Sequence, residues 1–183
     1  MTEIALIIHG TPAPKGSLAY KGRNKKTGAP VMAEQLKASK PWRDRVAGAI
    51  AEYLVSHEGS TLKRGVPVGV EATFTFPRPK AHYGTGRNEH RLKPSAPGYP
   101  TGHNTGDSDK LLRNILDAMQ DAGLVVDDAQ VVEVTGRKTY PVDDATAGLP
   151  DALPHPGALV RVYPIRPVWL LPASPGLLPE DGP

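Results

Sequence analysis

The stretch that decides the fold is residues 106–119, which read GDSDKLLRNILDAM. Its apolar residues recur at the spacing of one helix face: Leu112, Ile115, Leu116 and Met119. Gly123 then follows at a position that suits the left-handed residue after a helix end. The pattern predicts an amphipathic helix from Ser108 to about Ala122.

Two pairs of aspartates flank this helix. Asp107 and Asp109 straddle its start, and Asp127 and Asp128 lie just past its end. Each pair alone has an ordinary explanation, because aspartate caps helix N-termini and favours turns. We expect the turn at Gly123 and a returning strand to bring Asp128 back beside the helix start. Converging carboxylates would repel one another, and a divalent cation such as Mg²⁺ resolves that conflict, so all four aspartates are candidate metal ligands.

Basic side chains accompany the carboxylates. Arg113 lies four residues after Asp109, in the order that favours a helical ion pair. One interpretation is a surface ion pair that contributes little to stability. The other is that Arg113, in a nuclease, holds the scissile phosphate. We predict the second role for Arg113, with Asp117 orienting it from a second layer and Lys110 contacting phosphate. His103 is either a neighbour of the site or an ordinary loop histidine.

Charge is distributed unevenly along the chain. Residues 1–100 hold 16 Lys/Arg and 7 Asp/Glu, a net charge of +9, whereas residues 101–183 hold 6 and 12, a net charge of −6. A basic region beside a cation-binding centre suits a polyanion, although uneven surface charge alone gives the same totals. Two basic segments rich in glycine and proline, 10–30 and 77–106, are predicted as loops, the first of them a loop or an irregular hairpin. We expect these loops to bind DNA through Lys15, Lys21, Arg23, Lys25, Arg78, Lys80 and Arg87.

The remaining elements follow from apolar periodicity. Strands are predicted over 3–9, 66–76, 130–140 and 158–165, and a helix over 39–57 with Ser39 as its N-cap. The order β-α-β-loop-α-β-β predicts an α+β fold, in which two helices pack on one face of a small mixed sheet. We expect residues 1–166 to form a single domain and residues 167–183 to form a proline-rich flexible tail.

Composition excludes several classes of protein. The chain has no cysteine, which excludes disulfides, thiolate metal sites and a cysteine nucleophile. Its six histidines show no paired metal-ligand spacing, and no phosphate-binding, dinucleotide or serine-hydrolase motif occurs. No targeting signal or membrane-spanning stretch is visible, so we expect a cytoplasmic protein that does not contact a membrane.

Residues 106–113 (GDSDKLLR), 116–119 (LDAM) and 127–131 (DDAQV) resemble the signature of the RusA-type Holliday junction resolvases. Segments 14–17 and 78–87 also resemble the phage and actinobacterial members. The resemblance implies a homodimeric endonuclease, dependent on Mg²⁺ or alternatively Mn²⁺, that nicks four-way DNA junctions in pairs during recombination and repair. It places the essential aspartates on Asp107, Asp109 and Asp128. Arg113 stands where the family has a lysine, and arginine keeps the charge of lysine but not its shape or titration behaviour.

Two other functions remain open at this point. A branched-DNA-binding protein without catalysis would bind junctions in Ca²⁺ and leave them intact in Mg²⁺. A metal-dependent enzyme acting on nucleotides would use the Asp-x-Asp pair as a diphosphate clamp, with little salt-sensitive affinity for DNA.

Overall fold

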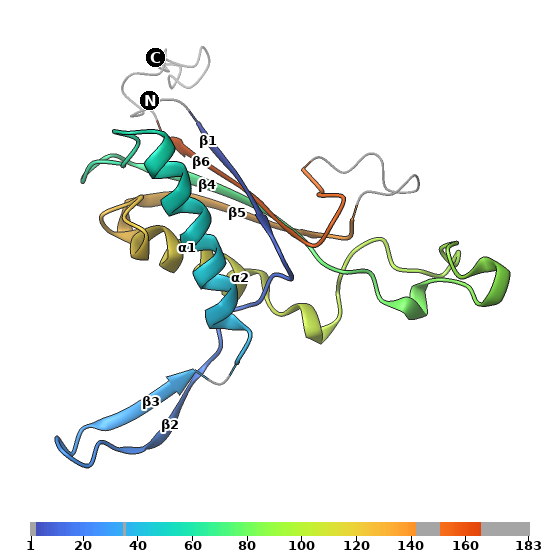
Figure 1. The fold of residues 1–183 in the computed structure, drawn as a ribbon, viewed down its shortest axis with the longest axis horizontal. Helices are drawn as coiled ribbons and strands as arrows, with labels where there is room; N and C mark the ends of the chain where they lie inside the picture. The colour runs from blue at the N-terminus through green and yellow to red at the C-terminus, as the bar shows by residue number, and fades with distance from the viewer. Residues whose placement is uncertain (1–2, 35, 142–150, 166–183) are drawn as a thin grey trace, which may run out of the picture.

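The structure is a computed structural model, and it describes residues 3–34, 36–141 and 151–165. A four-stranded mixed sheet, two helices and a separate hairpin make up the fold (Figure 1). The sheet contains β1 (Ile4–His9), β4 (Val68–Thr75), β5 (Val131–Thr139) and β6 (Gly157–Pro164). The helices are α1 (Ser39–Ser56) and α2 (Ser108–Asp121), and the hairpin pairs β2 (Leu18–Arg23) with β3 (Pro30–Glu34). This is the α+β class predicted from the sequence.

The order of strands in the sheet is β1-β6-β4-β5. The central strand β6 runs antiparallel to both β1 and β4, whereas β5 runs parallel to β4. A parallel neighbour needs a long crossover connection, and residues 76–130, with α2 among them, supply it. In the described sheet β5 is an edge strand, with β4 as its one neighbour.

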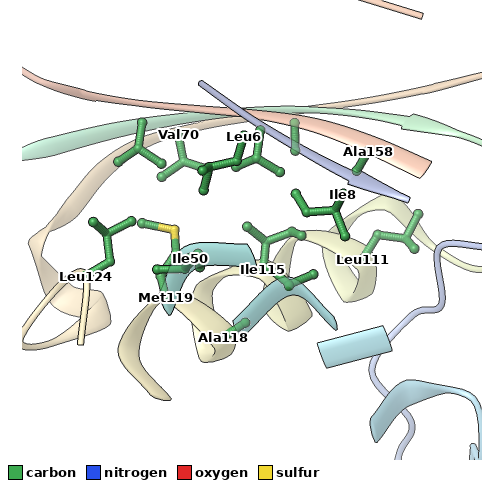
Figure 2. Packing of buried hydrophobic residues seen from close by; sticks show 14 of the residues in the cluster. Leu6, Ile8, Ile50, Val70, Leu111, Ile115, Ala118, Met119, Leu124 and Ala158 are labelled. Atoms are coloured by element: carbon green, nitrogen blue, oxygen red, sulfur yellow. The ribbon is translucent and has the colours of Figure 1, made fainter. Parts of the chain in front are cut away.

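Both helices cover the same face of the sheet (Figures 1 and 2). The buried side chains of α2 include Leu111, Ile115 and Met119, which pack with Ile50 of α1 in one apolar cluster. Of the apolar residues in the predicted stripe, Ile115 and Met119 are buried, whereas Leu112 and Leu116 are partly buried against the same cluster. An added Cβ at Gly136 of β5 would lie 2.7 Å from Leu112 Cδ1, so this glycine lets α2 approach the strand.

The start of α1 differs from the prediction. Ser39 is the first residue of the helix, Ala38 holds the N-cap position, and no side chain caps this end. Ser39 is instead buried, and its hydroxyl faces Asn114 of α2, with Asn114 Nδ2 donating to Ser39 Oγ at 3.0 Å. Ser39 therefore contributes to the packing of α1 against α2 and does not cap α1.

Of the two basic segments, the first is the irregular hairpin that the sequence allowed, and the second contains short turns where a loop was predicted. The segment 10–30 forms most of the β2–β3 hairpin, which extends away from the sheet and helices (Figure 1). The segment 77–106, here called the excursion, contains three 3-10 turns at Lys80–His82, Gly86–Asn88 and His103–Thr105. The predicted tail at 167–183 lies outside the described residues. In the part of the chain that is described, no helix is both long and apolar enough to cross a membrane.

Candidate functional site

The start of α2 presents an exposed carboxylate at Asp107. This residue has the backbone of an N-cap, yet its side chain makes no capping hydrogen bond. Its carboxylate instead pairs with the ammonium of Lys110 at 3.0 Å. That hydrogen bond and the charge of Lys110 hold the pKa of Asp107 below its usual range, with smaller contributions from Lys138 and His103. Asp107 therefore stays ionised and faces solvent, where a cation can reach it.

Lys138, which the sequence analysis did not single out, lies at this same end. Its ammonium donates to the Gly106 carbonyl at 3.0 Å and to Thr105 Oγ1 at 3.3 Å. A shallow pocket of about 350 Å³ is lined by Asp107, Lys138 and His103 among others. The alternation of side chains along a strand could have indicated Lys138 from the sequence. Lys138 lies two residues after Gly136, so both are on the side of β5 that faces the helix. His103 is thus a neighbour of the site.

Asp109 and Arg113 are both exposed on α2. Within the described residues, no ion pair joins Arg113 to Asp109. Asp117 does not orient Arg113 either, because its carboxylate pairs with Lys15 at 2.5 Å and with Arg43 at 3.5 Å. The reason is that α1 and the chain leaving β1 both pack along this face of α2 and bring those two cations to Asp117. The predicted support of Arg113 by Asp117 is wrong.

The second aspartate pair lies at the far end of α2. Asp127 caps a 3-10 turn at Asp128–Gln130, and its Oδ1 accepts from the Ala129 amide at 2.9 Å. Asp128 is exposed. Since α2 has 14 residues, its two ends are separated by about 21 Å.

The expected convergence of the carboxylates is therefore wrong for a single chain. The strand β5 does return along α2, but Asp128 precedes its beginning, and it is Lys138 near its end that reaches the helix start. Among the described residues, no group of three histidine, aspartate or glutamate side chains is close enough to hold a metal ion together. One chain supplies only Asp107 and Asp109 at one end of α2, and Asp127 and Asp128 at the other.

Comparison with known families assigns the chain. The sequence profile of the family Endodeoxyribonuclease RusA matches residues 10–146, about three quarters of the length. The chain belongs to the RusA endodeoxyribonuclease family. The match includes both aspartate pairs, the hairpin and the excursion. No curated protein sequence matched the chain.

The residues of this RusA-family chain that were predicted to bind DNA fall into two groups. Lys21, Arg23 and Lys25 on the hairpin, and Lys80 and Arg87 on the excursion, are exposed. The other three are less exposed and contact groups of the same chain, as shown for Lys15 and Lys110 above.

Arg78 belongs to that second group. Its guanidinium carbon lies 4.1 Å from the centroid of the Tyr140 ring, and its Nη1 donates to the Pro97 carbonyl at 3.0 Å. Tyr140 is also contacted edge-on by the His82 ring. Arg78 therefore ties the base of the excursion to the end of β5.

Proposed function

We propose that this chain is a Mg²⁺-dependent endodeoxyribonuclease that resolves four-way DNA junctions by paired nicking. The proposal rests on one observation, the RusA-family match over a segment that carries exposed carboxylates at Asp107, Asp109 and Asp128. A DNA substrate also agrees with the exposed lysines and arginines of the hairpin and excursion. A cytoplasmic location is part of the same proposal.

The donor set at the start of α2 fits a hard divalent cation. Asp107 and Asp109 offer exposed carboxylate oxygens, and neither is used to cap the helix. These residues would hold Mg²⁺ or Mn²⁺, which when bound supplies an activated water and offsets negative charge on the phosphate. Arg113, exposed one turn beyond Asp109, would bind the scissile phosphate. Lys138 holds the Gly106 carbonyl and so positions the backbone that leads into Asp107.

The site would be completed by a second copy of the chain. In the described sheet β5 has a strand neighbour on one side only, and its exposed side chains include Val132 at 62% and Val134 at 46%. An exposed apolar edge strand readily pairs with another strand. Two copies joined at β5 around a two-fold axis would run antiparallel.

Such pairing would bring the separated carboxylates together. The beginning of one β5 would lie beside the end of the other, where Lys138 contacts the start of α2. Asp128 of one copy, with Asp127 next to it, would then lie near Asp107 and Asp109 of the other. The contact that forms the homodimer would create two identical acidic sites, which suits two symmetric nicks in one junction.

The direct test is cleavage of a synthetic mobile four-way junction, with its linear arms as the control substrate. We expect symmetric nicks on opposed strands in Mg²⁺, none without metal, and none by Asp109→Asn. Cutting of the linear arms at the same rate would indicate a general nuclease. Binding in Ca²⁺ without cleavage in Mg²⁺ would indicate a binding protein, and cleavage of mononucleotides would indicate a nucleotide enzyme.

A mixing experiment tests the shared site. Asp109→Asn and Asp128→Asn are each expected to be inactive as homodimers. In a heterodimer of the two, a site shared between copies leaves one of the two sites fully intact, so co-refolding the variants should restore single nicks. If each site lay within one chain, both sites would carry a substitution and no nicking would return. The matched control is Asp109→Asn co-refolded with Asp107→Asn. This mixture has no intact site whether the site is shared between copies or lies within one chain, so it should not nick.

A further inference from the structure

The hairpin β2–β3 carries an exposed apolar pair. Tyr20 is 59% exposed and Met32 is 49% exposed. The two residues are direct cross-strand partners, so their side chains lie on the same face of the ribbon. The hairpin extends away from the body of the chain, so this face is open to a partner (Figure 1).

The hairpin that carries this pair is basic. Its exposed cations are Lys21, Arg23, Lys25 and Lys26, and Glu34 is the single acidic residue in the sequence of 18–34. A partner that fits must combine negative charge with flat apolar surfaces. Nucleic acid with unstacked bases has both, because phosphates meet the cations while base faces stack on aromatic rings.

The tip of the hairpin is held in a defined shape. Asn24 Oδ1 accepts from the amides of Lys26 at 2.9 Å and Thr27 at 3.3 Å, and the Asn24 carbonyl accepts from the Gly28 amide at 2.8 Å. Arg23 Nη1 donates to the Gly28 carbonyl at 3.1 Å. A hairpin ordered before binding loses less conformational entropy when it binds.

The root of the hairpin is fixed to α2. Ala13 precedes the hairpin and Ser39 follows it, and the buried Asn114 donates to the Ala13 carbonyl at 2.8 Å and to Ser39 Oγ at 3.0 Å. Pro14 packs so closely on Gly106 that an added Cβ there would lie 2.3 Å from Pro14 Cγ. The first contact lies in the middle of α2 and the second lies just before its start, so the root of the hairpin has a fixed position relative to the helix that carries Asp107 and Asp109.

We propose that the Tyr20–Met32 face is a stacking platform for bases exposed at the branch point of a DNA junction. The platform would set the distance from the branch point to the cut. This inference rests on the proposed function and names how the same protein distinguishes a junction from a duplex. Stacking is chosen because base faces inside a linear duplex are already covered, whereas base pairs beside a branch point can present theirs.

The test compares binding to a four-way junction and to a linear duplex of the same arm sequence, in Ca²⁺ so that no strand is cut. Tyr20→Ala and Met32→Ala should each raise the Kd for the junction roughly tenfold, the loss expected for one stacked base. The Kd for the duplex should stay unchanged, and Tyr20→Trp should retain the preference. Ile7→Ala is the matched control, because Ile7 is a strand residue exposed to 56% outside both basic segments.

A 2-aminopurine placed beside the branch point reports stacking directly. Its fluorescence should change when wild-type protein binds and should not change with Tyr20→Ala. An unchanged junction Kd in both variants, or an equal loss on junction and duplex, would overturn the platform. Wild-type cleavage in Mg²⁺ is measured in parallel, so absence of cleavage counts against the proposed function, whereas the binding preference alone decides the platform.

Discussion

Asn114 offers the sharpest test of how the hairpin is attached to the helix. Its side chain is fully buried and donates to the Ala13 carbonyl and to Ser39 Oγ. Ser39 Oγ is also within hydrogen-bond distance of Asn114 Oδ1. The variant Asn114→Ala would leave both of those groups without a partner in a buried site. An unsatisfied buried polar group destabilises by about 1–3 kcal/mol, so we expect a loss of about 3 kcal/mol in the free energy of unfolding.

Urea denaturation followed by circular dichroism measures this loss. With a slope of about 2 kcal/mol per molar urea for a domain of this size, the midpoint should fall by about 1.5 M. Gln120→Ala is the matched control, because Gln120 is exposed on the same helix and its replacement should change stability by less than about 0.5 kcal/mol.

A double-mutant cycle adds the partner. Ser39→Ala combined with Asn114→Ala should destabilise by less than the sum of the single changes, because both remove the same contact. A midpoint shift below about 0.5 M for Asn114→Ala, or strict additivity in the cycle, would refute the view that this asparagine fastens the hairpin to α2.

Three further outcomes follow from contacts in the structure. Lys110→Gln should raise the pKa of Asp107, since Lys110 lowers it and its loss lets the carboxyl take a proton at higher pH; a ¹³C NMR titration of metal-free protein checks this, and an unmoved midpoint contradicts it. Gly136→Ala should destabilise by about 1–3 kcal/mol in thermal or urea unfolding, because the added methyl meets Leu112; an unchanged midpoint would show that α2 shifts freely. Val134→Asp should give a folded monomer by analytical ultracentrifugation without junction cleavage, because charge opposes strand pairing at the β5 edge; a dimer that still cleaves would exclude that edge as the interface.

The sequence predicted those parts of the fold that depend on local periodicity. The helix α2 was predicted because its apolar residues repeat with helical spacing and Gly123, with a φ of 75°, ends it. The strands β1, β4, β5 and β6 were predicted within about two residues from their short apolar runs and, for β4, from the alternation of its apolar residues. Strand order was not predictable, because pairing β5 parallel to β4 depends on contacts between distant segments.

The candidate site was predictable only in its residue types. Sequence places aspartates at both ends of α2 but says nothing of the direction in which the returning strand leaves Asp128, and so it suggested a convergence that one chain does not make. For the segment 10–30 the sequence left a loop and an irregular hairpin open, for another reason. A ribbon whose Tyr20 and Met32 both face solvent buries no face, so it lacks the alternation that reveals a strand.

The length of α2 has a consequence for how cleavage depends on the amount of protein. Because the helix holds Asp107 about 21 Å from the end that leads to Asp128, an isolated chain would lack a complete site however well it folds. Below the dissociation constant of the dimer, the cleavage rate would then rise with the square of the chain concentration. Such a nuclease would be silent when scarce, and the helix would act as a spacer that protects DNA from single copies.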